Sequence, residues 1–468
     1  MLFNSGTFIV FFAVVLTLYW LLRDYRLQNA LLLVASYVFY SAWNWKFLFL
    51  LMASTIVDYI VGLRMNKAAT PAGRRMYLLA SLSFNLGMLG FFKYFNFGIE
   101  SLAVLLQQIG LTPHLPTLYV ILPVGISFYT FQSIGYTLDV FRRKREPIRD
   151  PLVFAVYVAY FPQLVAGPIE RSTTLPPQFE KPRTLTGEDF RIGSEWILLG
   201  YFKKVVIADT LAPMVDYVFT HPRDTSGIVS LVGIVAFALQ IYGDFAGYTL
   251  IARGISRWMG IRLMQNFRRP YLARSPRDFW TRWHISLSTW LRDYLYVGLG
   301  GNRKGGTRTY INLMVTMLLG GLWHGARWNF VLWGAYHGVL LVICHALGVG
   351  KGETRARPVV VLGQIALTFL LALGGWLLFR VASMDQLGAI VENIATNFRW
   401  TPDLHFYVRP TLTMFALLVA YHVWQEKRRD EFILLHANQW LRFGAYAFMV
   451  LTIVSFRFTP VAFIYFQF

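Results

Sequence analysis

The sequence predicts an all-α protein that crosses a membrane many times. Hydrophobic residues make up 56% of the 468 positions and charged residues only 15%, whereas a soluble domain usually carries about 25% charged residues. The mean hydropathy is +0.46, and long apolar runs recur along the chain. Only helices or closed barrels satisfy every backbone polar group in hydrocarbon, and these runs have the length of helices. We therefore expect about 11–13 transmembrane or re-entrant helices in a single domain over residues 1–468.

Each apolar run is a candidate span. We expect the first to be a retained helix and not a cleaved signal, because no positive segment precedes it and Tyr19-Trp20 ends it. The candidate spans are 7–22, 29–45, 46–63, 76–92, 117–141, 152–168, 196–218, 228–250, 309–325, 328–347, 358–381, 411–425 and 441–457.

Basic residues between the runs orient the chain. Loops 64–75 and 142–150 are rich in Lys and Arg, which predicts that both are cytoplasmic, that the charge-poor stretch 93–116 faces out, and that the N-terminus lies outside. The block 253–308 carries eleven Arg and one Lys against two Asp, which is half of the chain's net charge of +20. It is also predicted to be cytoplasmic.

This topology requires one irregular segment. Two apolar runs, 152–168 and 196–218, lie between the second cytoplasmic loop and the span at 228–250, and only one of them can cross fully. The first contains Pro162, Gly167 and Pro168, which break helices, so we expect it to be re-entrant or interfacial. The polar stretch 169–195 is expected to be a loop.

Several functional classes are disfavoured. A net charge of +20 would point to nucleic acid in a soluble protein, but here no solvated basic domain exists, so no nucleic-acid partner is expected. Cys344 is the only cysteine, and metalloprotease, dithiol and serine-hydrolase motifs are absent. The histidines show no recognised zinc spacing, so no metal is expected.

The block 278–296 combines polar and aromatic residues. At helical spacing His284, Ser288 and Arg292 fall on one face. The segment is too polar to span and too aromatic to be a solvated helix, which favours an interfacial or re-entrant helix. A plain membrane-surface anchor explains the same pattern. The glycine-rich loop that follows, 300–306, carries Arg303 and Lys304, which suit either phosphate binding or a simple turn.

His324 has the most specific setting. It lies in Gly320-Gly-Leu-Trp-His-Gly325, between two apolar runs. The run 309–325 would be about 26 Å long as a helix, against a hydrocarbon core of roughly 30 Å, so we expect His324 below the membrane surface. A neutral histidine there suits general base catalysis of acyl transfer. An interhelical hydrogen bond is the alternative. We expect a packing role for His337 and span-end positions for His345 and His422.

These motifs together resemble those of the membrane-bound O-acyltransferases. The similar segments include the histidine-bearing block from Phe279 to Tyr296, the loop from Gly300 to Gly305, and Leu318 to Ala326. Five upstream segments are also similar: Ala35 to Tyr40, Leu122 to Phe128, Tyr160 to Pro168, Lys203-Lys204 with Ile207 to Asp209, and Phe245 to Tyr248.

The resemblance implies a helical core with a central tunnel, and it is greatest to the branch that acetylates bacterial exopolysaccharides such as alginate and cellulose. It implies His324 as the catalytic residue and His284 as its partner, in the basic block 253–308 and the catalytic segment 309–347. The implied donor is acetyl-CoA on the cytoplasmic side of a bacterial inner membrane. The implied partners are membrane lipids, an exopolysaccharide synthesis and acetylation complex, and periplasmic acetyltransferases.

Several assignments follow from that resemblance. Donor contacts are expected from Arg282, Arg292, Asn302, Arg303 and Lys304, although these cations also serve topology. The related branch that transfers D-alanine to teichoic acid shares the histidine block, and a non-catalytic carrier or a scaffold are further alternatives. One departure concerns position 250, where many relatives carry Asp and this chain carries Leu. Asp244 lies nearby in the sequence.

Overall fold

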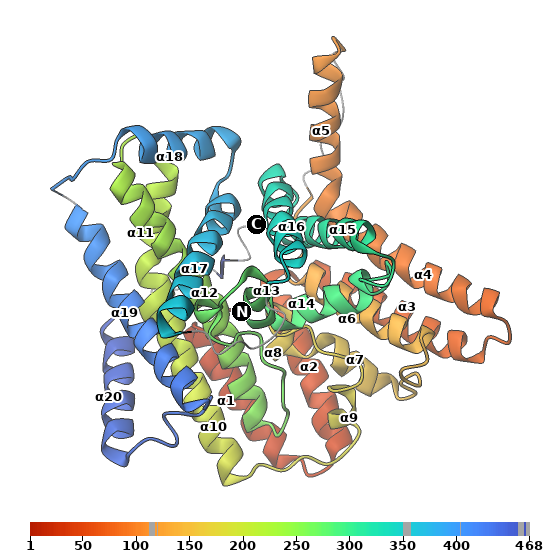
Figure 1. Ribbon diagram of the computed structural model, residues 1–468. Coiled ribbons are helices and arrows are strands. Elements are labelled where there is room, and N and C mark those ends of the chain that lie inside the picture. Colours follow the sequence, from red (N-terminus) through yellow and green to blue (C-terminus); the bar gives the residue numbers. More distant parts are fainter. Residues whose placement is uncertain (112–117, 119, 350–356, 403, 457–462, 465–468) are drawn as a thin grey trace. The chain divides into compact units, whose positions relative to one another are not determined.

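The computed structural model describes residues 1–111, 118, 120–349, 357–402, 404–456 and 463–464. The predicted all-α class is confirmed: the described residues form helices and their connections, without a β-strand (Figure 1). Residues 112–117, 119 and 457 belong to predicted segments but lie outside the described part. The chain divides into two compact units.

The first unit contains most of the N-terminal part of the chain, residues 1–186, together with residues 255–264 and 325–327. Helices α3, α4 and α6 pack against one another in it, and α2 packs against α7. Its helices are α1 (Gly6–Leu21), α2 (Tyr25–Asn44), η1 (Trp45–Phe47), α3 (Leu48–Lys67), α4 (Pro71–Leu89), η2 (Gly90–Tyr94), α5 (Phe95–Gln108), α6 (Ile126–Phe141), α7 (Pro151–Ala159), α8 (Phe161–Leu164) and α9 (Pro176–Phe179).

The second unit holds both candidate histidines. Helices α15 and α16 lie side by side in it (Figure 1). Its helices are α10 (Gly187–Tyr201), η3 (Phe202–Asp209), α11 (Thr210–Thr220), α12 (Gly227–Trp258, whose last turn belongs to the first unit), η4 (Pro270–Leu272), α13 (Pro276–Arg282), α14 (Ile285–Trp290), η5 (Leu291–Tyr296), α15 (Gly306–His324), α16 (Trp328–Ala346), α17 (Pro358–Arg380), α18 (Met384–Thr396), α19 (Leu404–Arg428) and α20 (Gln439–Ser455).

The protein is a multi-pass membrane protein. Among the described residues, six helical stretches are long and apolar enough to cross a bilayer. Two of them each contain two consecutive helices, α2 with α3 and α4 with α5, and the other four are α12, α16, α17 and α19. The remaining predicted spans correspond to helices that are shorter or less apolar.

The run at 152–168 is interrupted, as its prolines and glycine predict. Helix α7 ends at Ala159, and α8 covers only Phe161–Leu164. Pro162 sits in the first turn of α8, where its missing N–H costs no hydrogen bond. Both helices are almost wholly buried, so the backbone breaks inside protein, where irregular structure is tolerated.

Three helices were not expected from the sequence. The stretch 93–116 contains α5, and the expected loop at 169–195 contains the short α9 and the start of α10. Helix α18 also lies outside the predicted spans; it is amphipathic, and Ser383 caps its N-terminus by accepting a hydrogen bond from the Gln386 N–H at 3.2 Å. Helices of this kind lack the continuous apolar run that identifies a span.

Glycines on α12 bring the site elements together. A Cβ at Gly247 would lie 2.7 Å from the Gly200 carbonyl oxygen and 2.9 Å from the Lys204 backbone nitrogen. A Cβ at Gly243 would lie 2.9 Å from the Lys203 carbonyl oxygen. The four-residue spacing of these glycines therefore allows two helix backbones to touch. The segment that approaches them, η3, is π-helical, a conformation that is frequent at functional sites.

The close approach gives a first prediction. Gly247→Ala should lower the thermal stability of the purified protein in detergent, at a cost of about 1–3 kcal/mol, because the added methyl group pushes η3 away. Gly363→Ala is the matched control on α17, where nothing lies within 4 Å of the new Cβ and alanine favours the helix. Equal melting temperatures for the two variants would contradict the packing argument.

Candidate active site

Backbone hydrogen bonds join the residues just before α13 to the residues just after it, and the site is built on this pairing. The Arg268 N–H donates to the Arg282 carbonyl at 2.9 Å, and the Ile285 N–H donates to the Asn266 carbonyl at 2.9 Å. The Asn266 side-chain oxygen also accepts a hydrogen bond from the Ser286 N–H at 3.2 Å. Asn266 is 1% exposed, so a buried amide fixes the start of α14.

His284 lies at the break between α13 and α14. Its φ of +43° is in the left-handed region, which costs a side-chain-bearing residue about 1 kcal/mol or more. The prediction of one helix with His284, Ser288 and Arg292 on a common face is therefore wrong. Arg292 is exposed and follows in the π-helical η5, whereas His284 is completely buried. The Asn266 contacts, which sequence spacing does not reveal, hold the break.

Aromatic rings surround His284. Its ring centroid lies 4.7 Å from that of Phe245 on α12 and 5.7 Å from that of Trp323 on α15, both edge-on. Complete burial lowers the pKa of the His284 imidazole to about 3, because an apolar environment disfavours the charged form. His284 is consequently neutral at physiological pH.

His324 is the last residue of α15 and is 5% exposed. Its ring packs edge-on against Trp323 at 4.9 Å, Trp333 at 4.9 Å and Phe379 at 5.2 Å. Trp323 therefore contacts both histidines, and the structure brings them together across one indole ring. His324 is therefore buried within the protein, and its depth below the membrane surface stays a prediction.

His337 completes this cluster on α16. Its ring lies 4.8 Å from Trp333 and 5.1 Å from Trp280, and it stacks on Phe279 at 6.4 Å with an interplanar angle of 5°. These contacts agree with the packing role expected for it. His345 lies in the last turn of α16, as predicted.

A basic cavity of about 360 Å³ lies beside the turn that carries His284. Asn266 and Phe267 line the cavity, as does Ala246, the neighbour of Phe245. One layer of residues thus separates the cavity from His284. The charged residues in its lining are Lys203, Arg253, Arg268, Arg269, Arg429 and Glu431.

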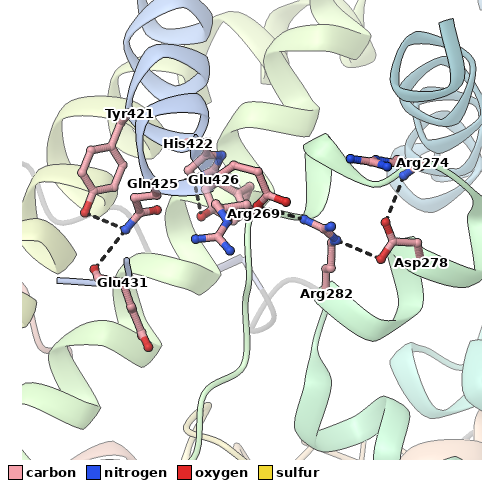
Figure 2. A network of polar contacts seen from close by, with 10 residues as sticks. Arg269, Arg274, Asp278, Arg282, Tyr421, His422, Gln425, Glu426 and Glu431 are labelled. Carbon is pink, nitrogen blue, oxygen red and sulfur yellow. Dashed lines mark hydrogen bonds and ion pairs between the residues drawn. The ribbon is translucent and has the colours of Figure 1, made fainter. Parts of the chain in front are cut away.

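Glu426 on α19 organises the charges near this cavity. Its carboxylate accepts from Arg269 at 2.6 Å and from Arg282 at 3.5 Å, and Arg282 also pairs with Asp278 at 2.9 Å (Figure 2). Glu431 likewise pairs with Arg253 at 3.0 Å.

The same network includes neutral groups. The His422 Nε2 lies 3.0 Å from the Tyr242 hydroxyl, which accepts a hydrogen bond from Lys203 at 3.1 Å. His422 lies within α19, which continues six residues beyond it and ends in the charged residues Lys427 and Arg428; its span-end position stays a prediction. The predicted span at 411–425 is shorter than the helix that forms.

The five residues predicted to contact the donor are absent from the cavity lining. Arg282 belongs to the Glu426 network, and Arg292 pairs with Asp293 at 2.7 Å. Asn302, Arg303 and Lys304 are exposed in the glycine-rich loop. None of the five lines the cavity.

Sequence reasoning missed most of the cavity. Lys203 and Lys204 interrupt the apolar run 196–218, and ionisable residues in such a run mark functional sites, so that signal was available. Lys204 is buried between Asp209 at 2.8 Å and Asp244 at 2.9 Å. Arg429 carried no comparable signal, because only the folded chain brings it near the block 253–308. Within the described residues, no group of three or more His, Cys, Asp or Glu side chains is arranged to hold a metal.

Comparison with known proteins identifies the class. Residues 43–347 match the membrane-bound O-acyltransferase family, a range that includes His284, His324 and most of the cavity lining. The chain belongs to this family, and it is an acyltransferase.

Two of the following relatives are similar over most of the chain, and a third over about half of it. A probable alginate O-acetylase of Pseudomonas putida is 46% identical over 90% of this chain and 86% of its own length. A peptidoglycan O-acetyltransferase of Helicobacter pylori is 34% identical over 84% of this chain and 80% of its own length. A teichoic acid D-alanyltransferase of Bacillus subtilis is 29% identical over 49% of this chain and 60% of its own length.

Burial of neutral His284 predicts a contribution to acid sensitivity. A histidine in the unfolded chain binds a proton below about pH 6.5, whereas folded His284 stays neutral until about pH 3. Between these pH values the unfolded state binds more protons than the folded state. The free energy of unfolding therefore falls as the pH drops below 6.5. At pH 5.5 this difference amounts to about 1.4 kcal/mol for one histidine.

Thermal denaturation at pH 7.5 and 5.5 tests this expectation. His284→Gln should lose less stability on acidification than the wild type. His405→Gln, at an exposed histidine, is the control and should match the wild type. The burial argument fails if His284→Gln and the wild type shift equally.

Proposed function

We propose that this acyltransferase takes acetyl from cytoplasmic acetyl-CoA and passes it across a bacterial inner membrane for O-acetylation of a secreted exopolysaccharide of the alginate or cellulose type. The observation that carries the proposal is the 46% identity to a probable alginate O-acetylase over 90% of the chain, with His284 and His324 joined across Trp323 inside the matched region. We further propose that residues 1–468 act as one acyltransferase domain with a central tunnel.

The transfer requires a base but no redox step. The oxygen of an acceptor hydroxyl attacks the carbonyl carbon of the thioester, the carbon–sulfur bond breaks, and the coenzyme leaves as its thiol. We propose that His324 takes the hydroxyl proton as general base and returns it to the leaving sulfur. Positioned general base catalysis contributes about 10²–10⁴-fold to such reactions.

His284 is proposed to orient the reacting groups through the shared contact with Trp323. It is completely buried, and burial lowers its pKa to about 3, so His284 is too weak a base to compete with His324 for a proton. The left-handed turn and the Asn266 contacts hold its ring in one place.

The donor is proposed to approach from the basic side. Arg303 and Lys304 are exposed in the glycine-rich loop, a location that suits capture of phosphates from solution, and Asn302 is proposed to contact the donor beside them. Arg282 and Arg292 are proposed to add positive potential along the approach, since their carboxylate partners leave donor groups for further contacts.

The partners we propose are membrane lipids, the complex that makes and acetylates the polysaccharide, and periplasmic acetyltransferases that receive the acetyl group. Transfer of D-alanine to teichoic acid is the second candidate function. It is supported by the match to a teichoic acid D-alanyltransferase, which covers 49% of the chain. The broader and closer similarity to O-acetyltransferases favours acetyl.

The O-acetyl content of secreted polymer tests the proposal. In cells that depend on this protein, His324→Ala should reduce acetyl content about 100-fold or more at unchanged membrane abundance, because the general base is lost. His284→Ala should also reduce it. His345→Ala is the matched control, because His345 lies in the last turn of α16 and should leave acetylation normal.

The same cells separate the alternatives. A D-alanyltransferase would place ester-linked alanine on an envelope polymer and leave exopolysaccharide acetyl unchanged by His324→Ala. A carrier without chemistry would release no coenzyme A thiol from acetyl-CoA in membrane preparations. Either result would overturn the acetyltransferase proposal.

A further inference from the structure

The cavity beside His284 has an excess of positive charge. Five cationic side chains line it, Lys203, Arg253, Arg268, Arg269 and Arg429, against the single carboxylate of Glu431. Glu431 pairs with Arg253 and accepts from Gln265 at 3.1 Å, so its charge is already engaged. Concentrating like charges in one cavity is unfavourable unless a bound anion offsets the repulsion.

Two of these cations have no acidic partner. Arg268 and Arg429 are both exposed, and neither side chain forms an ion pair with a described residue, whereas Arg253 and Arg269 each do. Since Lys203 and Asn266 are buried, the cavity opens toward solvent at the two arginines. Guanidinium groups there are available for bidentate phosphate binding.

A buried amide adds a neutral donor. The Nδ2 of Asn266 has no hydrogen-bond partner among the described residues, although the side-chain oxygen of the same residue is used by Ser286. An unsatisfied buried donor costs free energy, and an acceptor on a ligand in the cavity would relieve that cost.

Size and the apolar walls define the ligand further. A volume of about 360 Å³ falls within the range of organic-ligand sites, roughly 300–1,000 Å³. Trp196, Phe267 and Leu250 supply apolar walls. The Trp196 ring lies 3.9 Å from the Arg253 guanidinium carbon, and such stacking orients the planar cation. Apolar walls beside cations suit a phosphate ester that carries an organic group.

We propose that this cavity is a binding site for an organic phosphate ester, held by Arg268, Arg429 and Lys203, with the Asn266 amide as a further donor. If the phosphate ester is the coenzyme portion of the acyl donor, this inference deepens the proposed function and rests on it. A phospholipid headgroup has the same chemistry and is the other source. One residue layer, Phe245-Ala246 with Asn266-Phe267, separates the bound anion from His284.

Gln425 provides a charge test at constant shape. It lines the cavity, and Gln425→Glu adds a negative charge on a side chain of the same size. Gln425→Leu is the matched control, because it loses the same amide contacts to Tyr421 and Glu431 without adding a charge. Binding of coenzyme A to the full-length protein in phosphatidylcholine nanodiscs is measured by calorimetry. We expect Gln425→Glu to bind about tenfold or more weakly than Gln425→Leu. Equal affinities would overturn the proposal.

The arginines provide a second test. Arg268→Gln with Arg429→Gln should weaken coenzyme A binding about tenfold or more, because two charge-assisted contacts are lost. The matched control is Arg223→Gln with Arg428→Gln, which removes two exposed arginines outside the cavity lining, one of them adjacent to Arg429. Wild-type affinity in the cavity double variant would overturn the assignment.

The two sources of phosphate are separated by lipid composition. Nanodiscs containing phosphatidylglycerol should leave coenzyme A affinity unchanged if the cavity takes the coenzyme. If the cavity takes a lipid headgroup, phosphatidylglycerol should compete with coenzyme A, and native mass spectrometry should detect it on the wild type but not on the cavity double variant. Either result supports a phosphate-ester site and names its source.

His324→Ala distinguishes this inference from the proposed function. It lies outside the cavity lining, so it should retain coenzyme A binding while losing polymer acetylation. Loss of acetylation in His324→Ala with wild-type binding in every cavity variant would remove the cavity site and leave the acetyltransferase proposal intact. If coenzyme A binding depends on the cavity residues but His324→Ala acetylates the polymer fully, the cavity site stands and the catalytic role proposed for His324 fails.

Discussion

Ion pairs from α19 to the segment 265–286 are the interaction on which the site depends. Glu426 binds Arg269 and Arg282, which flank the two ends of that segment, and Glu431 binds the Gln265 side chain at its start. Arg282 is 13% exposed and Arg269 16%, and charges this buried are costly unless they are paired. The carboxylates of α19 and the following turn therefore fix where an otherwise irregular stretch of chain lies.

Once that segment is fixed, the strained turn at His284 becomes tolerable. Asn266 supplies two acceptors to the N–H groups of Ile285 and Ser286, and such hydrogen bonds contribute about 1 kcal/mol each. Together they are comparable with the cost of a left-handed residue. Aromatic packing from Phe245 and Trp323 then buries the imidazole. Strain at one residue is offset by ordered contacts from three other elements.

The sequence was sufficient for the helical class, because apolar runs are local signals. The local motifs around His284 and His324 also singled out two histidines that the structure buries against one indole ring. Sequence reasoning failed at the break between α13 and α14, where Asn266, 18 residues earlier in the chain, overrides helical periodicity. It also missed the cavity, whose lining extends from Trp196 to Glu431. In the sequence, Arg268 and Arg429 look like ordinary topology determinants. Only folding places them in one cavity, and no sequence periodicity or motif spacing predicts that contact.

If the cavity binds the donor and His324 is the base, as we propose, the layer between the cavity and His284 reconciles two opposed electrostatic needs. Binding phosphates requires several positive charges, whereas a base that accepts a hydroxyl proton must itself be neutral. Cations close to an imidazole suppress its protonation, which preserves the neutral form, but direct contact with them would also lower its basicity and weaken its catalysis. Phe245, Ala246 and Phe267 lie between the cationic side chains of the cavity and His284. Trp323 extends that apolar layer to His324. Under the proposed mechanism, a chain that placed Arg268 against either histidine would gain donor affinity and weaken the proton transfer proposed for His324.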